Sequence, residues 1–192
     1  MALIVALIVL AAMSLAATAL IRAVDTTIAI AGNLGFRDAA IPAVDAAIET
    51  AWAALYERNL IADRDHDLPA QGYYASRQPG ADVRGVPSAL QQIDGSAEAA
   101  GVLDAGNGNT VRYMIERICL GPGPPAPARC ALVRPYGAAA IVIAEPDQAP
   151  PMVPVFRVTV RVDGPRNTVT HVQAMIRDGT PPQRMSWRIL VE

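Results

Sequence analysis

Lysine is absent from this sequence of 192 residues, so all 16 of its basic side chains are arginines. Without lysine, the chain has neither a phosphate-binding P-loop nor a Schiff-base amine. It also lacks a Gly-x-Ser-x-Gly elbow and a His-Glu-x-x-His zinc motif, and its two histidines, His66 and His171, have no evident nucleophile beside them. We therefore expect no enzymatic activity and no cofactor.

Blocks of like charge are absent as well. The 16 basic residues are balanced by 18 acidic ones, which gives a net charge of −2. Nucleic-acid-binding domains usually gather their basic residues on one face or along one segment, and no such cluster is present here. We expect no nucleic-acid partner.

The amino-terminal segment lacks charge entirely. From Met1 to Ile21 only Ser14 and Thr18 are polar, and Arg22 is the first ionisable side chain. In a helix these residues extend for about 32 Å, which matches the roughly 30 Å hydrocarbon core of a bilayer. A signal peptide normally has a basic region before its apolar stretch, whereas here apolar residues follow Met1 directly. Residues 1–22 are therefore predicted to form a transmembrane helix.

A second helical pattern follows without a linker. From Asp38 to Tyr56, apolar or small residues recur at intervals of three and four positions, and charged residues fall mainly between them. This pattern predicts an amphipathic helix that continues the first one over residues 23–58. Four residues predict an interruption or loosening of that helix: Gly32, Asn33, Gly35 and Pro42.

Residues 59–192 are expected to form one globular domain, with loops and short helices over 59–110 and extended segments after them. The clearest signal is a hairpin around the turn at 163–167, before which valines alternate with Arg157, Thr159 and Arg161. We expect the valine face to pack on the helix and Arg157 and Arg161 to meet solvent or a partner subunit. The predicted fold class is α+β, with one long helix on an antiparallel sheet of about four or five strands. The predicted strands are 111–119, 138–144, 153–162, 168–176 and 184–191.

Cysteine is scarce. Cys119 and Cys130 are the only two, and the residues between them are rich in glycine and proline. A disulfide here would close a ring that stabilises the fold by about 3 kcal/mol in the chain-entropy model, in an oxidising compartment such as the periplasm. We predict this disulfide, with two unpaired thiols as the alternative; a zinc site would need more ligands.

An acidic run at 63–67 carries carboxylates at alternate positions, as the first half of an EF-hand does. Leu68 stands where that loop has glycine, and Tyr74 stands where it has its bidentate glutamate. We interpret the run as a solvated loop, with calcium binding as the alternative.

Several stretches near the amino terminus share a pattern with one protein family. They are the apolar run 1–10, the step Ile21-Arg22, the step Ala31-Gly32-Asn33-Leu34 and the alanine-rich run 39–51. Over about the first 55 residues the chain resembles PilX-type minor pilins of the bacterial type IV pilus. It departs from them at Asp45, since many relatives carry an Ala-Ala-Glu step there.

This resemblance implies a pilin-like fold and a structural function in the fimbrium. A prepilin peptidase would remove a leader ending in glycine and methylate Met1 as the mature first residue. The subunit would cross the inner membrane once, with its amino terminus in the cytoplasm, and then enter the extracellular pilus. The implied partners are other minor pilins, the major pilin, a tip adhesin, the prepilin peptidase and, before assembly, the inner membrane.

Position five sharpens this expectation, because most major pilins have a glutamate there that pairs with the terminal ammonium of a neighbour. This chain has Val5. An unpaired carboxylate in hydrocarbon costs several kcal/mol, so a subunit with no neighbour ahead of it gains by lacking one. Val5 therefore favours a place in the pilus tip or priming complex, and the alternative is an unspecialised minor pilin. A minor pseudopilin of a type II secretion system and a membrane-anchored periplasmic binding module stay open as other functions.

Overall fold

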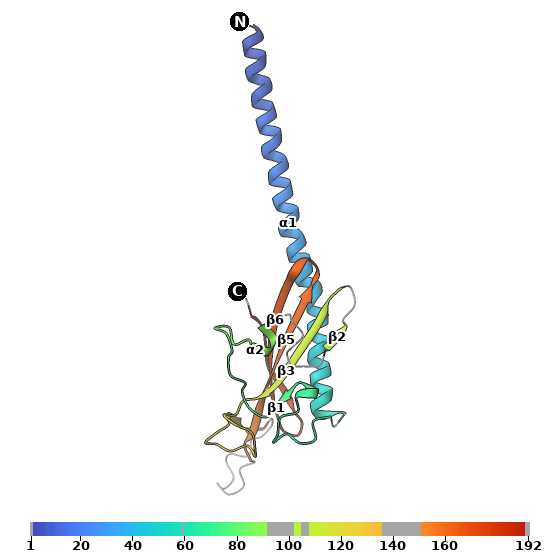
Figure 1. The fold of residues 1–192 in the computed structure, drawn as a ribbon, viewed down its shortest axis with the longest axis vertical. Coiled ribbons are helices and arrows are strands. Elements are labelled where there is room, and N and C mark those ends of the chain that lie inside the picture. The colour runs from blue at the N-terminus through green and yellow to red at the C-terminus, as the bar shows by residue number, and fades with distance from the viewer. Residues whose placement is uncertain (1, 59, 92–101, 105–107, 136–150, 191–192) are drawn as a thin grey trace. The chain divides into compact units, whose positions relative to one another are not determined.

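A computed structural model of the chain describes residues 2–58, 60–91, 102–104, 108–135 and 151–190 (Figure 1). The chain divides into two compact units, Met1–Ala39 and Ala40–Glu192. Helix α1, Ala2–Tyr56, belongs to both units. The chain therefore has an α+β layout, in which the second unit packs the end of this helix on a sheet.

The first unit is helical throughout its described residues. The side chains of residues 2–31 are exposed, and the hydroxyls of Ser14 and Thr18 donate to the carbonyls of Ala11 and Leu15 within the same helix. These two hydroxyls are thus satisfied within the helix, as the interior of a bilayer requires. Among the described residues, α1 is the one helix that is long and apolar enough to cross a membrane, a test that a signal sequence also passes.

The predicted loosening of the helix is not seen. Helix α1 continues through Gly32, Gly35 and Pro42 and ends at Tyr56, close to the predicted end at residue 58. The two glycines cost about 1 kcal/mol each relative to alanine but impose no positive φ here. Pro42 is exposed, so the hydrogen bond that its ring removes is lost on the solvent side of the helix.

Four long antiparallel strands form the centre of the sheet in the second unit. They lie in the order β3 (Thr110–Arg117), β5 (Val153–Gly164), β6 (Thr168–Arg177) and β7 (Gln183–Leu190). Their positions agree with four of the predicted strands, including the hairpin. The fifth predicted strand, 138–144, lies outside the described residues.

Three short strands bring the sheet to seven within the described residues. They are β1 (Tyr73–Tyr74), β2 (Val102–Asp104) and β4 (Leu132–Val133). Strand β1 runs parallel to β3, so the sheet is mixed and not purely antiparallel as predicted. Strands of two or three residues carry no alternation long enough to recognise. Three short helices complete the described elements: η1 (Pro69–Gln71), α2 (Ser88–Gln91) and η4 (Pro165–Asn167).

The main core lies between the end of α1 and one face of the sheet. The helix presents small side chains such as Ala47 and Ala51, both fully buried, which allow its backbone to approach the strands closely. Val158, Val160 and Val162 of β5 are fully buried in the same cluster. The prediction that the valine face packs on the helix is therefore confirmed.

The last turn of α1 is fixed by Arg64, which follows the helix. Its guanidinium donates to the carbonyl of Leu55 at 2.5 Å and to both carboxylate oxygens of Asp178 at 3.1 Å. The same group lies 5.0 Å from the ring centroid of Tyr56 and 5.8 Å from that of Phe156. One side chain thus joins the helix end to the loop after β6.

Candidate functional site

The apolar half of α1 is the most unusual surface of the described chain. Nearly every large side chain from Leu3 to Ile30 is exposed, and Val5 is 59% exposed. Soluble proteins rarely expose an apolar surface of this extent, and where one occurs it usually marks a contact with a membrane or with another protein. Such a segment is suited to lipid or to other apolar helices. Met1, the predicted processing and methylation site, lies outside the described residues.

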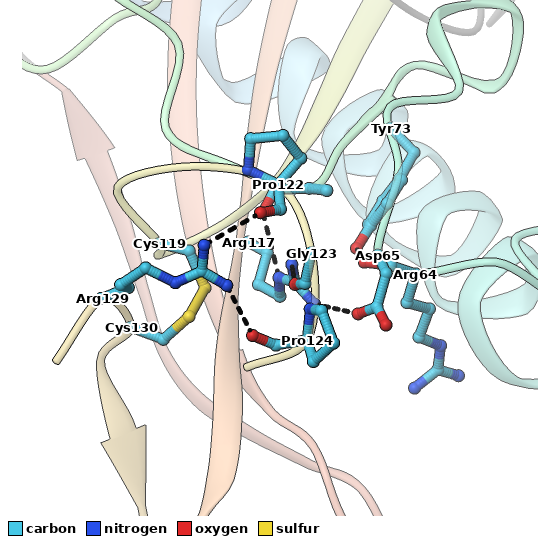
Figure 2. The surroundings of a disulfide bond; sticks show 11 residues. Arg64, Asp65, Tyr73, Arg117, Cys119, Pro122, Gly123, Pro124, Arg129 and Cys130 are labelled. Carbon is cyan, nitrogen blue, oxygen red and sulfur yellow. Dashed lines mark hydrogen bonds and ion pairs between the residues drawn. A yellow bond between two sulfur atoms is a disulfide. The ribbon is translucent and has the colours of Figure 1, made fainter. Parts of the chain in front are cut away.

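Cys119 and Cys130 are joined in a disulfide, as expected (Figure 2). The ring that they close is also held from within by Arg129, which donates to the carbonyl of Pro124 at 2.9 Å and to that of Pro122 at 3.4 Å. The prolines and glycines of the ring leave these carbonyls outside any regular ladder, so a side-chain donor takes the place of a strand neighbour.

Arg117 connects the disulfide ring to two other segments, and sequence reasoning missed it. Its guanidinium donates to the carbonyls of Ala75 and Gly123 and to the carboxylate of Asp65 at 2.9 Å (Figure 2). The side chain is 1% exposed. Its place within the predicted strand 111–119 gave no signal, because its partners Ala75 and Asp65 lie 42 and 52 positions away.

The acidic run at 63–67 directs its three carboxylates to different partners. Asp65 binds Arg117, Asp67 accepts from the N–H of Ala75 at 2.7 Å, and Asp63 contacts the ring of His66 at 2.7 Å. The N–H of Asp65 and the ring of His66 lower the pKa of Asp63. The described residues contain no group of three or more histidine, cysteine or acidic side chains placed to hold a metal. Two of these carboxylates thus connect the run to Arg117 and to Ala75.

Arg157 and Arg161 lie on the sheet face opposite the helix, where both are largely withdrawn from solvent and residues 72–91 contact Arg161. Arg157 binds Glu116, its partner in register on β3, at 2.6 Å, and Glu116 is fully buried. Arg161 is 2% exposed and donates to the carbonyls of Leu90 and Gln91. This arrangement differs from the expectation that both arginines meet solvent or a partner subunit. Residues 72–91 occupy that position instead.

Asp163 resolves a conflict of charge on the same face. Arg112 of β3 and Arg161 of β5 stand directly opposite each other in register, and like charges in that position repel. The carboxylate of Asp163 lies 3.1 Å from Arg112 and 2.7 Å from Arg161, so it serves both. The end of β5 thus supplies a carboxylate that is shared by the two arginines.

The two histidines differ in their surroundings. His66 is exposed beside Asp63, whereas His171 is buried in the polar layer with its Nε2 3.3 Å from the carbonyl of Leu90. Burial lowers the pKa of His171, the hydrogen bond to Leu90 opposes this shift, and the charge of Arg161 adds to it. His171 is therefore neutral at pH 7, and its ring nitrogen contacts main chain and no nucleophile among the described residues.

Comparison of the chain with protein-family models, with curated proteins and with solved structures finds no match. Its function is therefore argued from its own sequence and geometry.

Proposed function

We propose that this protein is a structural minor pilin of a type IV pilus that helps to prime assembly and sits in the tip complex. One observation carries the proposal. The helix α1 is exposed and apolar in its first half, and in its second half it buries an alanine-rich face against a sheet. This is the layout implied by the sequence resemblance to PilX-type minor pilins.

The apolar half of α1 suits both environments that such a subunit meets. In the membrane its side chains contact lipid, and in a filament they contact neighbouring apolar helices. Helix association in lipid has no hydrophobic driving force of its own, so the two states are close in solvation free energy and a subunit can pass from one to the other. The hydroxyls of Ser14 and Thr18, bonded within the helix, cost little in either state.

The tip position rests on Val5. It presents an apolar side chain where a carboxylate would need a neighbour's ammonium, so a subunit with nothing ahead of it leaves no buried charge unpaired. Assembly would begin when this subunit joins other minor pilins in the inner membrane. The complete tip would then present an adhesin.

The test uses the full-length gene in its own host, with an epitope tag at the carboxyl terminus. We expect the tagged chain in sheared filaments, with a methylated amino terminus by mass spectrometry and gold label at filament ends. Deletion of the prepilin peptidase should abolish all three results. Label distributed along filaments in proportion to their length would exclude a position at the tip. The chain would then be an unspecialised minor pilin.

The rival functions predict other results in the same experiment. A membrane-anchored binding module stays in the membrane fraction with an unprocessed amino terminus, whether or not the peptidase is present. A type II pseudopilin also requires the peptidase for processing. Deletion of the gene for this chain would then stop the release of secreted proteins and leave pili intact. Either result would overturn the proposal.

A further inference from the structure

Strand β7 forms one edge of the sheet. It pairs with β6 and, in the described part of the chain, with no second strand. Six of its eight residues in succession are exposed. An edge of this length presents unpaired N–H and C=O groups and is a template for another chain. At the opposite end of the sheet, the edge strand β1 has only two residues, whereas β7 is long and contains no proline.

An open groove lies beside this edge, on the face of the sheet that α1 covers. It has a volume of about 510 Å³ and runs between Ile41, Asp45 and Ile48 of the helix and Met185 and Trp187 of β7. Its lining includes the small side chain of Ala174 on β6. The groove belongs entirely to the second unit.

The groove exists because the helix covers β6 but only part of β7. Trp187 and Ile189 stand opposite Ala174 and Val172 in register, so they lie on the core face of the sheet. Ala174 and Val172 are 2% and 1% exposed, whereas Trp187 and Ile189 are 44% and 36% exposed. The apolar face of the sheet therefore continues beyond the helix, where Trp187 and Ile189 are only partly covered by the described residues.

One uncompensated charge lies on the other face of the same strand. Arg188 stands opposite Gln173 and donates to its side-chain oxygen at 2.9 Å, and no carboxylate of the described residues forms an ion pair with it. Arg184, the other arginine of β7, is already paired with Glu49. Strand β7 contains no acidic residue.

We propose that β7 and its groove bind an extended acidic segment of a partner protein, which adds to the sheet as a further strand. Successive side chains of a strand point to opposite faces, so the segment would alternate apolar residues, which enter the groove, with carboxylates, which face Arg188. Main-chain hydrogen bonds would supply affinity, and the alternate side chains would supply specificity. This inference uses the second unit alone and does not depend on the filament proposal.

A second copy of this chain is a poorer occupant of the same edge. Antiparallel pairing of two β7 strands would add a second Arg188 to the same face of the sheet, with no carboxylate from either strand. Arg188 thus acts against self-pairing and in favour of an acidic partner.

The test measures binding of labelled octapeptides to the full chain in detergent micelles by fluorescence anisotropy. The three probes alternate valine with glutamate, carry the same residues with the glutamates in one block, or alternate valine with arginine. We expect the alternating acidic peptide to bind at least about tenfold more tightly than the others, because it alone presents apolar and acidic faces together. Equal affinity for all three would overturn the proposal.

The backbone of the peptide provides a control that leaves the protein unchanged. A strand at a sheet edge directs the N–H groups of alternate residues to its neighbour and the rest to solvent. N-methylation of one alternate set should therefore abolish binding, and methylation of the other set should leave it within about twofold. If both methylated peptides bind as the parent does, strand addition is wrong.

Two protein variants test the two faces. Arg188→Glu should reverse the preference from the acidic to the basic peptide, whereas Arg77→Glu, an exposed arginine outside β7, makes the same charge change and should have no effect. Met185→Glu places a carboxylate beside the groove and should weaken binding at least about tenfold. Unchanged binding by Arg188→Glu, or a β7-dependent dimer without peptide binding, would contradict the proposal.

Discussion

The two faces of strand β5 are both largely buried but are stabilised by different interactions. On one face, Val158, Val160 and Val162 are fully buried against α1. On the other face, Thr159 and Arg161 are also withdrawn from solvent, beneath residues 72–91. The apolar face requires a matching shape, whereas the polar face requires a hydrogen-bonding partner for each buried group.

The cover of the polar face meets this requirement with main-chain carbonyls. Arg161 donates to the carbonyls of Leu90 and Gln91 in the short helix α2, and Gln173 donates to the carbonyl of Gly85 at 2.7 Å. Alternation along a strand therefore identifies its two faces but does not show which face meets water.

A charge introduced into the apolar layer between α1 and β5 should destabilise the protein most. Ala51→Glu places a carboxylate in a fully buried position with no partner, and we expect a loss of at least about 4 kcal/mol from the free energy of unfolding. Urea unfolding monitored by circular dichroism measures this loss. Ala46→Glu lies on the exposed side of the same helix and should cost less than about 1 kcal/mol. Equal effects would mean that the alanine face is not packed.

On the polar face of β5, removal of one member of the buried ion pair should also destabilise the protein. Glu116→Leu leaves the guanidinium of Arg157 without its carboxylate, and we expect a cost of about 3–5 kcal/mol. The double variant with Arg157→Leu should recover most of that loss, because two apolar side chains replace two paired charges. A double-mutant cycle in urea measures the coupling. Additive losses would indicate that the pair is not coupled.

Asp163→Asn tests the charge balance at the turn of the hairpin. The amide keeps the shape but removes the negative charge between Arg112 and Arg161, which should lower the free energy of unfolding by about 2 kcal/mol. Arg112→Gln added to this variant should restore part of the loss, since it removes the repulsion. Thermal unfolding at matched pH compares the three proteins, and a further loss in the double variant would contradict the assignment.

The histidine of the polar face predicts a dependence on pH. The folded-state pKa of His171 is lower than its ordinary 6.5, so below that pH the unfolded chain binds a proton that the folded chain resists. Stability contributed by neutral His171 is therefore complete above pH 6.5 and falls as the pH decreases, by at most about 1.4 kcal/mol per pH unit. Urea unfolding of His171→Gln should show a flatter profile between pH 7.5 and 5.5, and an unchanged profile would contradict the assignment.

The smallest effect is expected for an ion pair outside both layers. Arg184 and Glu49 are 48% and 59% exposed, so water screens their attraction. Glu49→Gln should change the free energy of unfolding by less than about 1 kcal/mol. If Glu49→Gln lowered the free energy of unfolding as much as Glu116→Leu, the exposed and buried ion pairs would not differ in their contribution to stability.

The sequence supported the long helix, the central hairpin and the disulfide because each has a local signal. The helix has an uncharged run followed by a repeat of three and four positions, and the hairpin has alternation around Asp163. The remaining features depend on contacts between distant residues. Arg117 contacts Asp65 and Ala75, which are distant in the sequence. Residues 72–91 cover the polar face of β5, although their sequence has no recognisable periodicity.

The edge strand shows a second limit. The residues of β7 predict a strand correctly, but their exposure depends on how far α1 extends across the sheet, and that distance is set by tertiary packing. The alternation that places Trp187 on the core face is the same alternation that buries Val160 on β5. Only the position of the strand within the sheet distinguishes a core residue from a groove residue.

The contacts of Arg64 have a mechanical consequence for α1. A pull along this helix reaches its last turn, where carbonyls without a helical partner would let the end unwind one residue at a time. Arg64 holds the carbonyl of Leu55 and is itself fixed to Asp178 after β6. Load on the helix therefore passes into the sheet through the packed alanine face and, at the last turn, through this one guanidinium, which keeps the helix end from unwinding.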